Sequence, residues 1–319
     1  MIKRQKFFSE AHYKNFLREH DEAGKLLKTT KFKSDSPKGE ATLRSSFIQR
    51  LALRKLTATY TAGEDISSLT HLLEDLIQKY EVSQAALAES EQASDISPLA
   101  IDDWPHEYEE CVQVIGLCIL LHRIDLLKRF VRLIDNAGYA GYAGYAGYDT
   151  LYEDLLCKVL PGRSDIDQWY HDVYSPLVQA IYAGTKEDAS NFLKIYCNQW
   201  YSAFRQASWH DTHLQGEEGN YVGYWAFEAG AIAFLYGIDD SKIDHMVYPK
   251  DLVEYARNHR PTDGSQVARV DAGQPCSKTG YWFTPAEANS RRRFQQGELM
   301  PNFSGSKWGD TIWYWSGDE

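Results

Sequence analysis

Residues 221–240, YVGYWAFEAGAIAFLYGIDD, form a nearly continuous apolar segment around which the rest of the chain can be arranged. From Tyr221 to Tyr236 the segment is apolar on every side, apart from Glu228. A helix that is hydrophobic all round is buried, so we expect a central helix that ends at Gly237. A buried carboxylate must be paired, and a structural tie to an Arg or a Tyr is favoured for Glu228 over a catalytic role.

Apolar residues at helical spacing surround this segment on both sides. The periodicity of 3.6 residues predicts further helices, and Thr185 and Pro249 suit the starts of two more. No alternating strand pattern occurs before residue 265, which indicates helices packed on helices. The expected helical runs are Leu43–Tyr60, Ile66–Tyr80, Tyr108–Leu121, Leu126–Ile134, a helix from Thr185 through Trp200, and Pro249 to about His259.

After Arg260 the texture of the chain changes, because Gly and Pro become frequent and short aromatic segments lie between them. Tyr281-Trp282-Phe283 and residues 311–315 are such segments, and they predict a small β-rich module. About fifty residues make a poor independent core, so we expect the tryptophans to pack on the helical body. The predicted fold is mainly α, an antiparallel bundle or helical-repeat-like body with a small β-rich C-terminal module. The expected domains are residues 1–160, 161–262 and 263–319.

Charge is distributed unevenly over the 319 residues, whose formal net charge is −11. Residues 1–60 carry 14 Lys+Arg and 6 Asp+Glu (+8), residues 61–264 carry 14 and 33 (−19), and residues 265–319 carry 6 of each (0). An acidic chain argues against a non-specific nucleic-acid binder. The acidic middle serves either solubility or the binding of a basic partner.

Several features bear on location. No apolar run reaches the length of a membrane span, so no membrane partner is expected. The basic start has no apolar region behind it, which argues against a signal peptide and favours the cytoplasm. Five widely spaced cysteines indicate reduced thiols in a core.

No catalytic, cofactor-binding or metal-binding motif is found. His210 and His213, with Glu217 and Glu218 nearby, superficially resemble a metal site, but the neighbouring glycines favour a solvated loop. Common nucleophile, phosphate-loop and dinucleotide motifs are missing from the sequence. We therefore expect a binding protein and no enzyme.

A fourfold Ala-Gly-Tyr repeat occupies residues 137–148. Removing three copies would leave an ordinary joint between two helices. A neutral loop insertion is favoured over a partner contact, because ordering the glycines would cost conformational entropy.

The central segment resembles the PoNe immunity (PoNi) family. The resemblance rests on G-Y-W-x-F-E-A from Gly223, G-I-D-D from Gly237 and Y-P-x-D-L from Tyr248, and it covers roughly residues 1–260. Residues 272–315 resemble a short module at the end of other bacterial toxin-immunity proteins. Together they imply a cytoplasmic antitoxin for a cognate DNase toxin of a type VI or contact-dependent system, with no catalytic residues.

The acidic loops supply the toxin-binding candidates, since a nuclease presents a cationic cleft. Tyr224, Trp225 and Glu228 are expected to be structural. A helical adaptor or chaperone for a secreted effector is the main alternative, an enzyme that reverses toxin damage is a weaker one, and a homodimer is left open. The first-choice contacts are Asp239, Asp240, Glu217 and Glu218, and the second choice is Asp102 and Asp103.

Overall fold

The computed structural model describes residues 3–94, 96–135, 144–259, 269–287, 289–303 and 311–317. The chain divides into two compact units, and each combines segments that are distant in sequence. Unit 1 comprises Met1–Tyr145 and His171–Asn258, and unit 2 comprises Ala146–Tyr170 and His259–Glu319.

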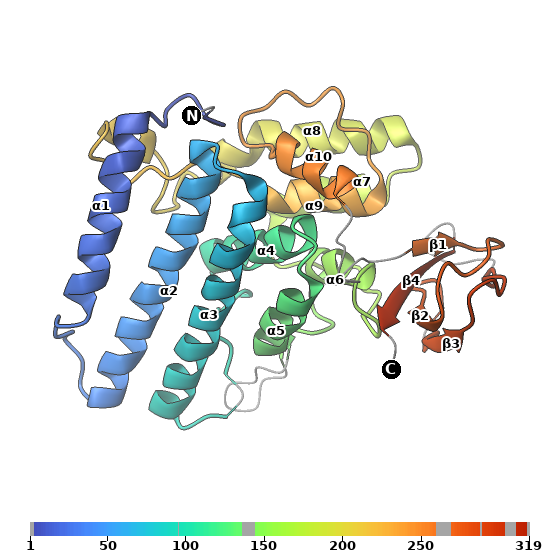
Figure 1. Cartoon of the computed structure of the whole chain (residues 1–319), viewed down its shortest axis with the longest axis horizontal. Coiled ribbons are helices and arrows are strands. Elements are labelled where there is room, and N and C mark those ends of the chain that lie inside the picture. Colours follow the sequence, from blue (N-terminus) through green and yellow to red (C-terminus); the bar gives the residue numbers. More distant parts are fainter. Residues whose placement is uncertain are drawn as a thin grey trace. The chain divides into compact units, whose positions relative to one another are not determined.

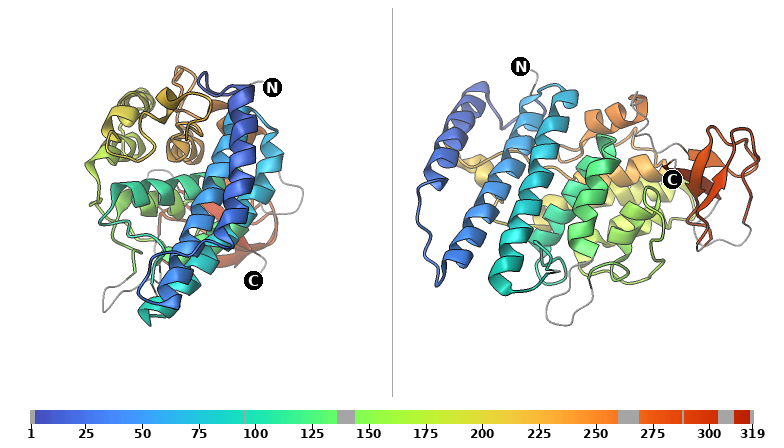
Figure 2. Two further views of the ribbon diagram at one scale, coloured as in Figure 1. Left: turned by 90° about the vertical axis from the view of Figure 1, so that its left-hand side faces the viewer. Right: turned by 60° about the horizontal axis from the view of Figure 1, so that its bottom comes forward.

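Three long helices of unit 1 lie side by side, in Figure 1 and in the right-hand view of Figure 2. Their ends follow local chemistry: Ser9 and Ser36 cap the first two helices through their hydroxyls, and Gly63 ends the second in the left-handed conformation. The helix α2 packs against both of its neighbours. The three are α1 (Glu10–Leu27), α2 (Pro37–Ala62) and α3 (Leu69–Glu91).

None of the remaining described helices of unit 1 is longer than α1, and α4 packs closely against α9. Gly116 of α4 makes this approach possible, because a Cβ atom there would lie 2.8 Å from the Phe227 carbonyl group. These helices are α4 (Pro105–Leu120), α5 (Ile124–Asp135), α7 (Ser175–Ile181), α8 (Lys186–Ala203), α9 (Phe227–Tyr236) and α10 (Lys250–Asn258). Short 3₁₀ turns cover Ile66–Ser68, Asp172–Tyr174 and Thr212–Gln215.

The expected central helix exists, but it begins later than the apolar pattern predicts. Helix α9 starts at Phe227, and residues 221–226 carry no regular secondary structure. Gly223 has φ of 118°, and side chains bond the backbone groups of this segment. The expected start at Tyr221 is therefore wrong, while the end at Gly237 is confirmed.

Unit 2 combines one helix, α6 (Thr150–Cys157), with an antiparallel sheet of order β1-β4-β2-β3. The sheet has its own core, which differs from the expectation that its tryptophans pack on the helical body. Trp282 and Trp313 lie inside it, because strand alternation sends both to the same face. The strands are β1 (Arg269–Asp271), β2 (Gly280–Phe283), β3 (Arg292–Phe294) and β4 (Ile312–Gly317). The core comprises Val270, Cys276, Trp282, Phe294, Met300 and Trp313.

A buried ion pair orders the segment around α6, since the Arg163 guanidinium donates to the Glu153 carboxylate at 2.6 Å. The same carboxylate accepts the backbone N–H of Gly147 at 2.7 Å. Of the Ala-Gly-Tyr repeat, residues 137–143 lie outside the described residues. The mainly α fold with a small C-terminal sheet is confirmed. None of the helices in the described ranges has the length and apolar run that a bilayer crossing requires.

Candidate functional site

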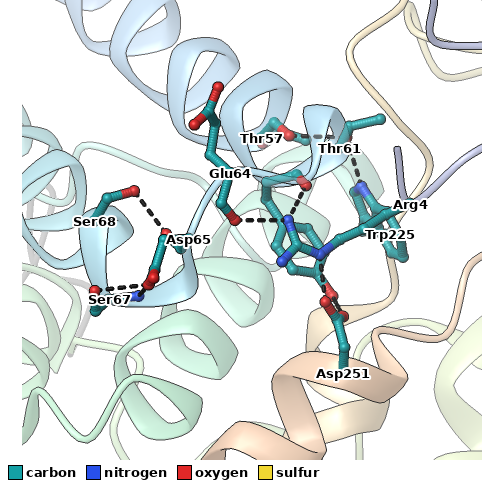
Figure 3. Close-up of polar contacts among 10 residues, drawn as sticks. Arg4, Thr57, Thr61, Glu64, Asp65, Ser67, Ser68, Trp225 and Asp251 are labelled. Atoms are coloured by element: carbon teal, nitrogen blue, oxygen red, sulfur yellow. Dashed lines mark hydrogen bonds and ion pairs between the residues drawn. The ribbon is translucent and has the colours of Figure 1, made fainter. Parts of the chain in front are cut away.

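The G-Y-W-x-F-E-A motif, which begins at Gly223, connects segments that are distant in sequence. Trp225 Nε1 donates to Thr61 Oγ1 at 2.8 Å (Figure 3). The Thr61 hydroxyl also donates to the Val222 carbonyl oxygen at 2.6 Å. The rings of Tyr60 and Trp225 meet edge to face with centroids 4.7 Å apart. A Cβ on Gly223 would lie 2.2 Å from Thr61 Oγ1. Glycine is thus required where this motif crosses the end of α2.

Gln5 is a buried hub for the same segment. Its Nε2 donates to the carbonyl oxygens of Tyr224 at 2.5 Å and Met246 at 2.8 Å. Its Oε1 accepts from the Tyr221 hydroxyl and from the Tyr224 N–H. One amide side chain therefore satisfies backbone groups that would be costly to bury unpaired.

Asp251 of the Y-P-x-D-L motif is also committed internally. It accepts hydrogen bonds from the Arg4 guanidinium (Figure 3) and from the Tyr60 hydroxyl. Arg4 also donates to the carbonyl oxygens of Tyr60 at 2.6 Å and Glu64 at 3.0 Å. This motif fastens the N-terminal segment and the end of α2 to α10.

Asp240 does not fit its expected role in toxin binding. The residue is 5% exposed, and its carboxylate accepts from the Tyr248 hydroxyl at 2.6 Å and from Arg257 at 2.7 Å. These bonds use both of its oxygens. We therefore correct its interpretation: Asp240 is an internal tie between the G-I-D-D loop and α10.

Two buried carboxyl groups lie in the aromatic interior of unit 1. Glu228 accepts from the Tyr196 hydroxyl at 2.6 Å, which confirms the expected structural tie. Glu109 accepts from Trp209 Nε1 at 2.9 Å and Gln113 Nε2 at 2.7 Å. Burial raises the pKa of Glu109 to about 8 and that of Glu228 to about 7. The charge of Glu228 further raises the pKa of Glu109.

The remaining acidic candidates are exposed. Asp239 caps the following turn through the Ser241 N–H at 3.0 Å. Glu217 accepts from the Ser9 hydroxyl at 2.7 Å, and Glu218 follows it in the same loop. Exposure leaves these carboxylates accessible to a partner.

Asp102 and Asp103 form a separate acidic loop next to a prominent aromatic residue. Trp104 directly follows them and is 56% exposed. The Tyr145 hydroxyl donates to Asp102 at 2.9 Å. The sequence indicated the carboxylates, but the exposure of this tryptophan was not predicted.

The histidine loop is held by aromatic contacts. Tyr201 stacks on His210 with centroids 4.0 Å apart and donates to Asp211 at 2.5 Å. His213 Nδ1 lies 2.8 Å from the Tyr224 hydroxyl. Within the described ranges, no group of three His, Cys, Asp or Glu could hold a metal ion.

These observations describe a helical scaffold in which side chains of the three motifs hold distant segments together and the acidic loops are exposed to solvent. Residues 147–252 match the family model of PoNe immunity proteins (PoNi), C-terminal. These residues are therefore similar to the C-terminal segment of the PoNi family, and the resemblance found in the sequence is confirmed over this part of the chain. The matched family is one of immunity proteins.

Among solved structures, protein PA2201 from Pseudomonas aeruginosa is similar to this chain. The TM-score is 0.56 at 20% identity, and the match covers 78% of this chain and 87% of the other. At this identity the likeness concerns the fold alone. Among curated proteins, none matches the chain.

Proposed function

We propose that this protein neutralises a cognate nuclease toxin by stoichiometric, non-covalent binding in the cytoplasm. The observation that carries this proposal is the PoNi match over residues 147–252. The toxin would arrive through a type VI or contact-dependent system. Inhibition by contact needs no turnover, and we assign no catalytic residue.

We place the principal toxin contact at Asp102, Asp103 and Trp104. A nuclease needs a cationic cleft for phosphates, and two exposed carboxylates would speed its capture by long-range attraction. An exposed tryptophan supplies the kind of anchor that dominates interface energies. Asp102–Trp104 combines charge and apolar surface in three consecutive residues. We therefore favour this loop over the first-choice contacts of the sequence analysis, which were Asp239, Asp240, Glu217 and Glu218.

Glu217 and Glu218 form a second acidic contact in the proposal. Leu214 and Phe7, at the edge of the same aromatic region, are exposed, and the Phe7 and His213 rings lie 4.6 Å apart. Asp239 remains a peripheral candidate. Asp240 is left out because both of its carboxylate oxygens have internal partners.

The first experiment co-expresses this chain with the toxin encoded beside it and then mixes the purified proteins. We expect rescue of growth and complete inhibition of nuclease activity at one-to-one stoichiometry. Equal killing with and without this protein would refute the proposed function.

The second experiment maps the contact by charge reversal. Asp102→Lys with Asp103→Lys should slow toxin association about tenfold at low salt, with a smaller effect at high salt. Trp104→Ala should mainly speed dissociation. Glu91→Lys with Glu254→Lys is a matched control, since both residues are exposed and the charge change is identical. If the control variant slows toxin association equally, the effect comes from net charge, and the proposed contact at Asp102 and Asp103 is contradicted.

A further inference from the structure

The hairpin formed by α1 and α2 presents apolar side chains to solvent. Leu26 is 65% exposed at the end of α1, and Leu43 and Phe47 of α2 are 39% and 44% exposed. Leu43 and Phe47 are four residues apart and therefore share one helix face. Phe32 of the connecting loop stacks on Phe47 with centroids 5.3 Å apart. We call Leu26, Phe32, Leu43 and Phe47 the hairpin patch.

The hairpin patch is held in a defined arrangement, because Arg44 fixes the loop that carries Phe32. Its guanidinium donates to the carbonyl oxygens of Leu27 and Thr30, the second at 2.7 Å. It also donates to Glu40 at 2.8 Å and lies over the Phe32 ring at 5.3 Å. The loop thus holds its aromatic side chain against α2.

Four lysines lie at the end of α1 and in the loop that connects it to α2, the same segment that carries Leu26 and Phe32. All are exposed, and within the described residues none of them forms an ion pair with an acidic side chain. Asp35 is the one acidic residue between Lys25 and Lys38, and the Arg50 guanidinium adds a cation 5.6 Å from the Phe47 ring centroid. The lysines are Lys25, Lys28, Lys31 and Lys33.

The positive charge favours an anionic partner, and the exposed aliphatic groups indicate which kind of anionic partner fits. Nucleic acids are held through phosphates and base edges, which leaves Leu26 and Leu43 without a role. Protein interfaces are depleted in lysine. A membrane surface takes lysines at its anionic headgroups and Leu and Phe at the acyl boundary. The combination therefore favours lipid.

We propose that the hairpin patch and its lysines bind the surface of an anionic lipid bilayer. This inference goes beyond toxin neutralisation and does not depend on it. It also revises the expectation of no membrane partner, which rested on the lack of a spanning segment, since surface binding needs only an exposed basic and apolar face.

Binding to an anionic bilayer is compatible with the net negative charge of the chain, because distances along α2 exceed the range over which salt leaves charges unscreened. Leu43 and Phe47 of α2 precede its last residue, Ala62, by 19 and 15 residues, so they lie about 29 and 23 Å from that end of the helix. The Debye length is roughly 8 Å at physiological salt, and only charges near the bilayer contribute.

The test is co-sedimentation of the full chain with vesicles. We expect binding to phosphatidylcholine vesicles containing about 30% phosphatidylglycerol and none to pure phosphatidylcholine. Binding should weaken strongly at about 0.5 M salt. Reversal of Lys25, Lys28, Lys31 and Lys33 to Glu should lower the partition coefficient by more than about a hundredfold.

A matched variant reverses four other exposed lysines of unit 1, Lys186, Lys194, Lys242 and Lys250. It should bind vesicles like the unmodified protein. Leu43→Ser with Phe47→Ser should weaken binding while the lysines remain, and a melting curve confirms that it folds. Equal binding to both vesicle types, or equal loss in both lysine variants, would overturn the proposal. Toxin inhibition is scored separately and should survive in all variants.

Discussion

Glu109 and Glu228 show how a buried residue can couple this fold to pH. Both carboxyl groups are buried, and each accepts hydrogen bonds from neutral donors instead of facing a cation. Burial therefore raises both pKa values above those of exposed glutamates. The folded protein holds protons near neutral pH that the unfolded chain has already released.

We predict that stability falls as the pH rises through this region. Below about pH 4.5 both states are protonated, and the contribution of the pair is fully present. This contribution is lost as the pH rises through the folded-state pKa values, which are about 7 for Glu228 and about 8 for Glu109. The free energy of unfolding should fall by up to roughly 1.4 kcal/mol per pH unit for each group. Denaturant titrations between about pH 5 and 9 measure this slope.

Glu228→Gln supplies the direct comparison, because an amide oxygen can still accept from Tyr196. This variant should show a shallower slope and exceed the unmodified protein in stability near pH 9. Glu218→Gln, at an exposed position, should leave the slope unchanged. An unaltered slope in Glu228→Gln would contradict the assignment.

The two carboxyl groups also differ in how well the sequence predicts them. Glu228 stands alone in an apolar run, so its burial and its polar partner were expected. Glu109 belongs to an acidic group with Glu107 and Glu110, and carboxylates in the first turn of a helix are usually exposed and favoured by the helix dipole. Its partner Trp209 lies 100 residues away, and no local pattern encodes that contact.

At the scale of elements, the α4–α9 contact depends on a glycine without a special backbone conformation. Gly116→Ala would place a methyl group 2.8 Å from Phe227 backbone atoms. We predict a loss of about 1–3 kcal/mol in the free energy of unfolding. Gly24→Ala in α1 is the control, since a Cβ there meets nothing within 4 Å, and it should gain up to about 1 kcal/mol. Stabilisation by both substitutions would mean that the two helices are not in tight contact.

The start of α9 shows that burial of a segment does not by itself make the segment helical. The apolar pattern from Tyr221 was correct about burial but incorrect about helix, because burial alone does not fix the backbone. Gln5 and Thr61 satisfy the backbone groups of residues 222 and 224. A segment with such partners needs no helical hydrogen bonds.

At the scale of the molecule, the thiols can report on the two units separately. All five cysteines are buried, as the sequence predicted, and burial raises the pKa of Cys197 to about 12. Cys157 and Cys276 belong to unit 2 although 119 positions separate them (276 − 157), and Cys111, Cys118 and Cys197 belong to unit 1.

We predict that Cys157 and Cys276 become reactive at the same denaturant concentration, because they belong to one compact unit. Pulsed alkylation followed by peptide mass spectrometry gives the midpoint for each thiol. The prediction is contradicted if Cys157 has the same midpoint as Cys111 and Cys118 while Cys276 has a different one. Residues 146–170 would then unfold together with unit 1.

The amino-acid sequence by itself determined the helical class, the small C-terminal sheet, the family resemblance and the burial of Glu228. Each of these is written in local periodicity, composition or a contiguous motif. Only the tertiary structure decided that Asp240 is an internal tie, that Glu109 joins Glu228 in the interior, and that Trp104 and the hairpin patch face solvent. Exposure and pairing depend on side chains brought together from distant positions, and periodicity along one segment carries no information about them.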